Sequence, residues 1–387
     1  MIVAYGGKNC WGFKDWMEIN FRINNNVPDQ YAFEGVRLVP TLCFEGANAS
    51  GKSCALKVLS FIVDFCLNSF SYKPNTPIFY DTFFYNNDKS EFYLKFLINS
   101  NINKEYTYEV TLDKHKVYKE SLYYIDLPNK KKTYIAKRKN NEFTSTLFEG
   151  DADKIILKSN SSLISTCIQY GIDNFKDIFE FLDNIDSNVI YTGTYVDQLK
   201  DNASEYYYNN DKVLKRTVNI IREFDLGLSD IKIDKVVDHG GNDIYISNFV
   251  YNVDDSARSL SYINQSTGTK LLYNRLLDFI RVLDNGGVLV FDELDTHLHT
   301  GIIHLLLNMF LDRRINNNKA QLVFTSHDTA ILNLLKKYRV YLFNKDNGES
   351  ICYRIDELPD NICYRNDRSL EQAYLSGAIG GTPNVKK

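Results

Sequence analysis

The sequence predicts an α/β fold that combines a mixed sheet, an antiparallel β meander and a helical insertion. Three observations predict it. An expected strand over 37–44, which ends in the short apolar run Leu42–Phe44, leads into a loop of small residues and then into helical spacing over 51–69. Short segments with alternating polarity fill 90–147 and are separated by Asn, Lys and Asp turns. The apolar run Val288–Phe291 and a second strand-like segment over 320–325, AQLVFT, are typical of strands buried on both faces of a parallel sheet.

The domain organisation follows from where these patterns change. Residues 2–22 alternate loosely and are expected to form strands around a turn, and two segments between 230 and 253 return to a strand pattern. Residues 152 to about 225 are mainly helical in pattern and rich in Asn, Asp and Tyr. We therefore predict one discontinuous domain, made of 1–150 and 236–387, which is interrupted by a mainly helical insertion over 151–235.

Composition limits the classes of partner. The 387 residues carry a formal charge of −4 and the pI is about 5.9, so the chain is not basic over its whole surface, and any nucleic-acid contact must come from a local patch. Residues 129–139 hold six basic residues around a Tyr and an Ile. This run predicts either contact with a nucleic-acid backbone or, as the simpler interpretation, a solvated hairpin.

The expected compartment is the cytoplasm. The seven cysteines are scattered without a C-x-x-C pair, which favours reduced thiols. The N-terminus lacks the basic and apolar regions of a secretion signal. The apolar stretch 55–67 is short for a membrane span and carries Lys57 and Asp64, so we expect no membrane association.

The segment 46–53, GANASGKS, fits the phosphate-binding pattern G-x-x-x-x-G-K-[ST]. Its backbone N–H groups are expected to surround the phosphates of a nucleoside triphosphate, with Lys52 on the β- and γ-phosphates and Ser53 on Mg²⁺. The predicted nucleotide-binding residues here are Gly46, Asn48, Ser50, Gly51, Lys52, Ser53 and Cys54.

Three further signals occur downstream in a fixed order. The turn Ser266–Thr269 precedes a helix, Asp292 and Glu293 end the first buried strand, and His327 follows the second. Taken singly, these residues also fit an ordinary turn, a helix cap and a structural histidine. Acids at the end of a strand next to the phosphate loop also predict a metal and catalytic site. In it, Asp292 would hold Mg²⁺ and Glu293 would orient or deprotonate the attacking water.

With these motifs in this order, the chain resembles the ABC-type ATPases of the SMC, RecF and OLD kind, and the resemblance implies an ABC-type P-loop ATPase head. In it, 46–53 is the Walker A loop, Ser266–Thr269 the signature motif, Val288–Glu293 Walker B, Leu294-Asp295 the start of the D-loop and His327 the switch histidine. The resemblance implies a head-to-tail homodimer with ATP and Mg²⁺ sandwiched between subunits. Ser266 and Gly268 of one subunit would face the nucleotide on the other, and Asp295 would contact it. Lys52, Glu293 and His327 would be catalytic, and Ser53 and Asp292 would hold the metal.

Several features narrow the resemblance. The signature lacks the Gly-Gly-Gln of transporter ATPases, no long coiled coil is apparent, and only 60 residues follow His327, too few for the Toprim domain of the OLD nucleases. Gln198 is the nearest candidate for a Q-loop residue.

The nearest likeness is to stand-alone anti-phage ATPases of the AbiL, RloA, PtuA and AriA types (AAA_15 or AAA_21), carried by "FDELDTHLH", the meander and the tail "LEQAYLSGAIGGTPNV". It implies a sensor or scaffold, dimeric or of higher order, in an antiviral, abortive-infection or toxin–antitoxin system with a separately encoded effector nuclease or toxin. The alternative is a RecF-like DNA-repair clamp.

Overall fold

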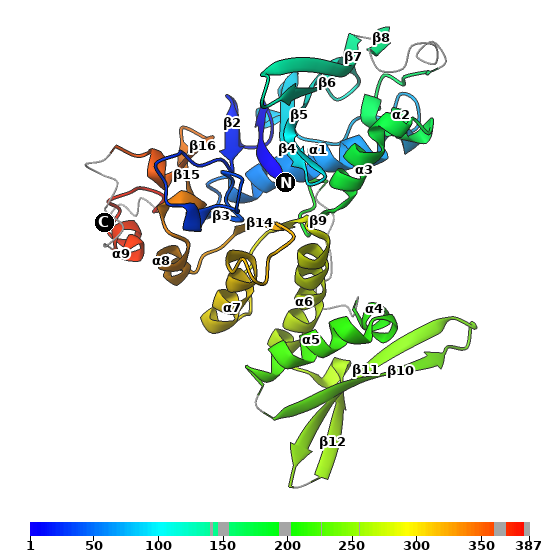
Figure 1. Cartoon of the computed structure of the whole chain (residues 1–387), viewed down its shortest axis with the longest axis vertical. Coiled ribbons are helices and arrows are strands. Elements are labelled where there is room, and N and C mark those ends of the chain that lie inside the picture. The colour runs from blue at the N-terminus through cyan, green and yellow to red at the C-terminus, as the bar shows by residue number, and fades with distance from the viewer. Residues whose placement is uncertain are drawn as a thin grey trace.

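The structure is a computed structural model that describes residues 1–139, 142–145, 155–192, 203–225, 227–254, 256–359 and 369–382. In these residues it contains a six-stranded mixed sheet, a seven-stranded antiparallel sheet and a three-stranded antiparallel sheet, with helices between and beside them (Figure 1). The predicted α/β class with a mixed sheet and a meander is therefore confirmed.

The six-stranded sheet holds both apolar runs and the strand before the phosphate loop. Its order is β16-β15-β3-β14-β13-β9, and all its strands are parallel except the edge strand β16. The bounds are β3 (Thr41–Gly46), β9 (Ile185–Ser187), β13 (Val288–Phe291), β14 (Gln321–Thr325), β15 (Val340–Asp346) and β16 (Glu349–Arg354). Strands β3, β13 and β14 are buried along their whole length, as their apolar runs predict. Their carboxyl ends meet at one edge of the sheet.

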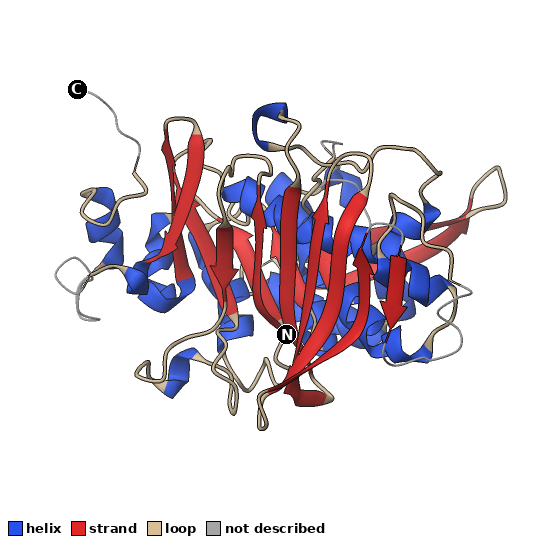
Figure 2. Cartoon of the chain, turned by 90° about the horizontal axis from the view of Figure 1, so that it is seen from above, coloured by secondary structure: helices blue, strands red, loops and turns tan. Residues whose placement is uncertain are grey.

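The seven-stranded sheet is the predicted meander with the N-terminal strands added at its edge. Its order is β2-β1-β4-β5-β6-β7-β8, and Figure 2 shows it curving across the molecule. The bounds are β1 (Ile2–Lys8), β2 (Met17–Asn20), β4 (Ser90–Ile98), β5 (Asn101–Leu112), β6 (Val117–Asp126), β7 (Lys131–Lys139) and β8 (Glu142–Ser145). Burial alternates along β4, so one face of this sheet packs on the core and the other meets solvent.

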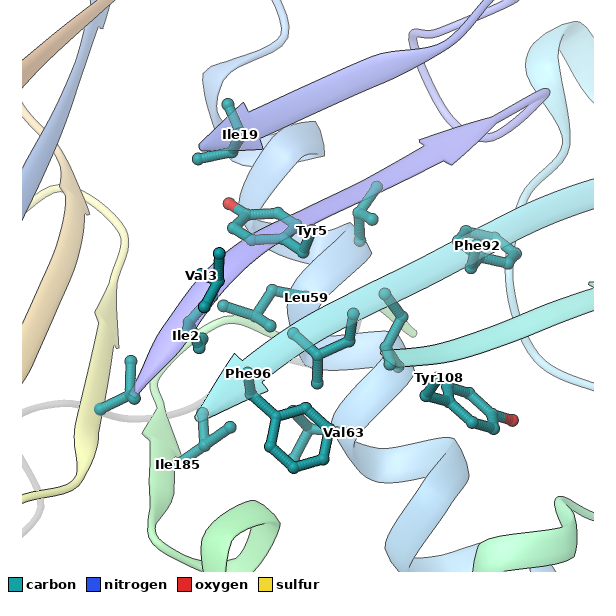
Figure 3. Packing of buried hydrophobic residues seen from close by; sticks show 14 of the residues in the cluster. Ile2, Val3, Tyr5, Ile19, Leu59, Val63, Phe92, Phe96, Tyr108 and Ile185 are labelled. Carbon is teal, nitrogen blue, oxygen red and sulfur yellow. The ribbon is translucent and has the colours of Figure 1, made fainter. Parts of the chain in front are cut away.

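Helix α1 (Lys52–Asn68) lies between the two large sheets. Leu59 and Val63 of α1 pack against Tyr5 of β1 and Phe92 and Phe96 of β4 in a single buried cluster (Figure 3). Among the described residues, the segment Lys52–Ser71 alone has the length and apolarity of a membrane span, so the stretch is longer than the sequence pattern suggests. Most of it is buried between the sheets, which accounts for its apolar character.

Further helices cover the remaining faces. Helices α6 (Thr267–Asn285) and α7 (Thr300–Leu311) pack on the other face of the six-stranded sheet and form a second buried cluster. Helices α2 (Leu163–Gln169) and α3 (Lys176–Asp183) pack beside α1. Helices α8 (Leu332–Leu335) and α9 (Leu370–Leu375) contact each other at the side where β15 and β16 lie (Figure 1).

The range 151–235 contains more than helices. Besides α2 and α3 it holds α4 (Ser204–Asn209) and α5 (Asp211–Arg222), but β9 from the same range joins the edge of the six-stranded sheet. Strand β10 (Leu228–Val237) begins there and pairs with β11 (Asp243–Val253), which pairs with β12 (Ser256–Ser261). This three-stranded sheet extends away from the two large sheets (Figure 1). The boundaries of the insertion stay a prediction.

Candidate functional site

The phosphate-loop sequence forms a tight connection between β3 and α1. Gly51 is the N-cap of α1 with φ +110°, so it offers no side chain to the N–H groups of the first turn, which remain available to a ligand. A Cβ at Gly51 would also lie 2.4 Å from Ser350 Oγ, so both the backbone angle and the close packing require glycine. Ala49, in the middle of the loop, has φ +62°.

Lys52 lies folded into the loop. Its Nζ donates hydrogen bonds to the carbonyl oxygens of Gly46 (2.7 Å) and Ala47 (3.2 Å), and the residue is only 7% exposed. Burial lowers the pKa of the Lys52 ammonium, and the neighbouring acids Glu45 and Asp292 oppose that shift. A cation held by two carbonyl oxygens can exchange them for phosphate oxygens with a short movement.

Thr325, at the end of β14, joins the two acids that follow β13. Its hydroxyl donates to Asp292 Oδ1 (2.5 Å) and accepts from the backbone N–H of Glu293 (2.7 Å). Asn188 holds the backbone of Asp292 on both sides of its Cα, because its Oδ1 accepts from the Asp292 N–H (2.7 Å) and its Nδ2 donates to the Asp292 carbonyl (3.2 Å). The acids are therefore fixed by Thr325 at the end of β14 and by Asn188, which follows β9.

Glu293 adopts a backbone conformation that is rare for a residue with a side chain. Its φ is +55°, and its carboxylate is exposed and accepts a hydrogen bond from Thr296 Oγ1 (3.2 Å). Such conformations cost free energy and persist where surrounding bonds hold them, often at functional sites. Here the Glu293 N–H bond to Thr325 is such a restraint.

A cavity of about 620 Å³ brings most of the predicted site residues together. Its lining includes Asn48, Ser50, Gly51, Lys52, Ser53, Cys54, Asp292, Glu293 and His327. Gly46, which ends β3 and begins the loop, is buried and does not line the cavity. The cavity also contains residues that the sequence reasoning did not select: Gly12, Ala49, Thr325, Lys345 and Ser350. Thr325 could have been selected from the sequence, because it is a polar residue at the end of a buried strand. Nothing in the sequence around Gly12 or Ser350 indicates that they belong to the site.

Besides Gly46, three predicted residues with described positions lie outside this lining. Ser266 is exposed and caps α6 by accepting from the Thr269 N–H (3.1 Å), and Gly268 is half-buried. Asp295 Oδ2 accepts from the backbone N–H of His327 (3.0 Å). Gln198 lies outside the described residues. Within one chain, the signature turn therefore does not reach the phosphate-loop cavity.

Helix α6 is tied to the segment after Glu293. Buried Arg275 of α6 donates to the carbonyl oxygens of Leu294 (2.8 Å) and Thr296 (3.3 Å). An added Cβ at Gly268 would approach the His297 carbonyl to 3.3 Å. The signature turn and the predicted D-loop thus share a packed contact.

The residues of the cavity fit a metal–triphosphate ligand. Ser53 supplies a hydroxyl oxygen and Asp292 a carboxylate oxygen, which are hard ligands suited to Mg²⁺. Thr325 engages Asp292 Oδ1, so Asp292 Oδ2 is the oxygen left for a metal or its water. The first-turn N–H groups of α1 and the Lys52 ammonium suit phosphate oxygens.

The basic run 129–139 lies on β7 at another cavity, of about 860 Å³, on the solvent face of the seven-stranded sheet. Lys137 lies over the Tyr134 ring, and Glu109 and Glu142 share the lining. Arg138 points the other way and donates to the buried carbonyls of Ser161 and Lys158. Acids offset the remaining lysines, so nucleic-acid contact here stays a prediction.

Replacing Thr325 with valine is expected to slow ATP hydrolysis about 10- to 100-fold with little change in ATP affinity. Valine keeps the shape but removes both hydrogen bonds, so Asp292 and Glu293 lose a shared anchor. Separate measurements of kcat and KM check this. Thr325→Ser retains the hydroxyl and should restore most of the rate. Normal turnover in Thr325→Val would exclude this positioning role.

Glu45, at the end of β3, predicts a pH dependence of stability. Burial raises the pKa of its carboxyl to about 8, against the effect of Lys52. The folded state therefore binds this proton more tightly than the unfolded state, so stability should fall as pH rises from about 4.5 to about 8. Glu45→Gln cannot ionise and should remove that fall, by an amount on the order of a few kcal/mol. Urea unfolding at pH 5, 7 and 9 measures it; parallel pH profiles for the two proteins would contradict it.

Solved structures similar to the chain include an Smc head bound to the C-winged helix domain of ScpA (12% identity, 92% of this chain and 98% of that chain, TM-score 0.46). Two others are Smc heads, one from Pyrococcus furiosus bound to the C-terminal domain of ScpA (11%, 92% and 97%, 0.44) and one from Pyrococcus yayanosii (8%, 97% and 99%, 0.47). No curated protein matches the sequence.

A family match covers most of the chain. Residues 43–333, which include the phosphate loop, the signature turn, the acids and His327, match the family described as "AAA domain, putative AbiEii toxin, Type IV TA system". The low identities and TM-scores of the structural matches add no argument, and the assignment rests on this sequence match. Because it spans well over half of the 387 residues, the chain belongs to this AAA-domain family of the AbiEii type.

Proposed function

We propose that the chain binds ATP with Mg²⁺ and hydrolyses it to ADP and phosphate. The observation that carries this proposal is the cavity in which the phosphate loop, Asp292, Glu293 and His327 meet. Phosphate release by the purified protein, measured with and without Mg²⁺, tests it. Release that depends on Mg²⁺ would support the proposal, and absence of nucleotide binding would overturn it.

Each residue has a role that its surroundings suit. The loop N–H groups and Lys52 would hold the phosphates, while Ser53 Oγ and Asp292 Oδ2 would hold the metal. Bound Mg²⁺ supplies neutralisation of phosphate charge. Glu293 would orient a water molecule and accept its proton, and His327, at the same cavity, would contact the terminal phosphate.

The site is proposed to be completed by a second copy of the chain. Ser266 is exposed and Gly268 is half-buried, and neither lines the cavity of their own chain. In a head-to-tail homodimer the turn of one subunit would close on the nucleotide of the other. The N-terminus of α6 would then direct its N–H groups to the phosphates.

At the cellular level we propose a sensor or scaffold of an anti-phage, abortive-infection system that controls a separately encoded nuclease or toxin. The family description, which refers to a toxin–antitoxin system, supports this direction. A cytoplasmic location and assembly into dimers or larger oligomers belong to the same proposal.

Purification from the native host, with identification of bound proteins and nucleic acid, tests the cellular role. The comparison uses the wild type and Glu293→Gln, each with ATP. A stoichiometric nuclease or toxin without DNA would support the proposal. DNA retained without a protein partner would replace it with the DNA-repair clamp.

A further inference from the structure

The segment Ser369–Thr382, here called the C-terminal segment, lies outside the family match and is docked on the ATPase core. It begins with α9, of which Leu370, Ala373 and Tyr374 are buried, and Ile379 further on is 3% exposed. Such burial shows a docked element and not a frayed terminus.

The C-terminal segment bonds directly to the phosphate loop. The backbone N–H of Ala47 donates to the Gly381 carbonyl (3.0 Å). The carbonyl of Ala47 in turn accepts from the Ser50 N–H (3.2 Å) and from Lys52 Nζ (3.2 Å). The bonded N–H belongs to the Gly46–Ala47 peptide, whose carbonyl oxygen also accepts from Lys52 Nζ (2.7 Å). Gly381 therefore holds one of the two loop peptides that bind the lysine.

Gly381 is itself held firmly. Its carbonyl also accepts from Tyr374 Oη (3.1 Å), and its N–H donates to Asn344 Oδ1 (2.9 Å). Its φ is +78°, and an added Cβ would lie 2.9 Å from the Tyr374 ring. Any side chain here would strain the backbone and push the segment away from the loop.

The same segment contacts the residues that follow His327. Asn333 of α8 accepts from the Leu370 N–H (2.9 Å) and donates to Glu371 Oε2 (3.2 Å). Helix α9 also packs against the turn Thr329–Ile331, two residues after His327. The C-terminal segment thus contacts both the phosphate loop and the turn that follows His327.

We propose that the C-terminal segment is a positioning element of the nucleotide site, with Gly381 pre-ordering the phosphate loop through Ala47. This inference rests on the proposed ATP binding. A loop that is already ordered loses less conformational freedom when phosphates bind, so affinity is higher. By thermodynamic reciprocity, a bound nucleotide must then stabilise the docking of the segment.

The test compares Gly381→Ala with Gly377→Ala. Both glycines have a left-handed φ, +78° and +74°, but a Cβ at Gly377 meets only Thr382 Oγ1 at 3.4 Å, and Gly377 does not contact the loop. Calorimetric titration with ADP and ATP should show about tenfold weaker binding for Gly381→Ala. This is the change in affinity that the loss of about one buried hydrogen bond would cause. Gly377→Ala should stay within about twofold of the wild type, and kcat at saturating ATP should change little in either variant.

A second measurement uses the wild type alone. Hydrogen exchange of the amides over 370–381 should slow when ADP is added. Tyr374→Phe, which keeps the ring but removes the hydroxyl bond to Gly381, serves if Gly381→Ala does not fold, and it should weaken binding in the same direction. This inference alone would be overturned if Gly381→Ala and Tyr374→Phe bound nucleotide as tightly as Gly377→Ala. Hydrogen exchange that did not slow with ADP would also overturn it. Absence of nucleotide binding by the wild type would overturn the proposed function and this inference with it.

Discussion

Glu293→Gln is expected to lower the rate of ATP hydrolysis by about 100-fold or more while ATP still binds. Glutamine keeps the size of the side chain and the bond from Thr296, but it cannot accept a proton from water. Because ATP would no longer be cleaved, closed dimers should accumulate. Phosphate release gives the rate, and light scattering after size-exclusion chromatography with ATP gives the mass.

Glu18→Gln provides the matched control. Glu18 is also an exposed glutamate that accepts a hydrogen bond from a hydroxyl, that of Tyr93 (2.6 Å), together with one from Asn20 Nδ2 (3.3 Å). It lies on β2 and does not line the phosphate-loop cavity. This variant should hydrolyse ATP at the wild-type rate and stay in the wild-type oligomeric state. Normal turnover in Glu293→Gln would remove Glu293 from the mechanism, and a slow variant that stays monomeric with ATP would contradict the dimer.

Lys52→Met is expected to weaken ATP binding by about 100-fold or more. Methionine fills much of the same space but loses the ammonium, and each charge-assisted bond to a phosphate is worth about 1.5–3 kcal/mol. Stability should change little, because the variant loses the bonds to Gly46 and Ala47 but no longer buries a charge. Calorimetric titration and thermal unfolding measure the two effects.

Lys57→Met is the control for this substitution. Lys57 is a half-buried lysine on the same helix, and it does not line the cavity. Its replacement should leave ATP affinity within about twofold of the wild type. If both variants bound ATP equally well, Lys52 would not be a phosphate ligand.

The parts of the fold that the sequence predicted are those with local signals. The phosphate loop, the meander and the strands before Asp292 and His327 each occupy one short stretch, where periodicity and turn residues act over a few positions. The predicted strand over 37–44 is β3, which begins at Thr41 and runs to Gly46.

The parts that could not be predicted depend on contacts between distant residues. Asn188 supports Asp292 across 104 positions, and a single asparagine in a polar stretch gives no sign of that partner. Strand β9 is three residues long, too short for a periodic pattern, although it completes the central sheet. The tail glycine Gly381 has a left-handed backbone angle, but nothing in the sequence indicates its partner, Ala47, which lies more than 300 residues earlier.

The strand order also sets the distance between the phosphate loop and the two acids. Strand β14 separates β3, which ends in the phosphate loop, from β13, which ends in the two acids. Two inter-strand steps of about 4.8 Å place loop and acids about 10 Å apart, whereas direct pairing of β3 with β13 would halve that gap. The wider gap would leave room for a phosphoryl group, its metal and one water molecule. The spacing between strands therefore suits the terminal phosphate of the proposed nucleotide, rather than its base.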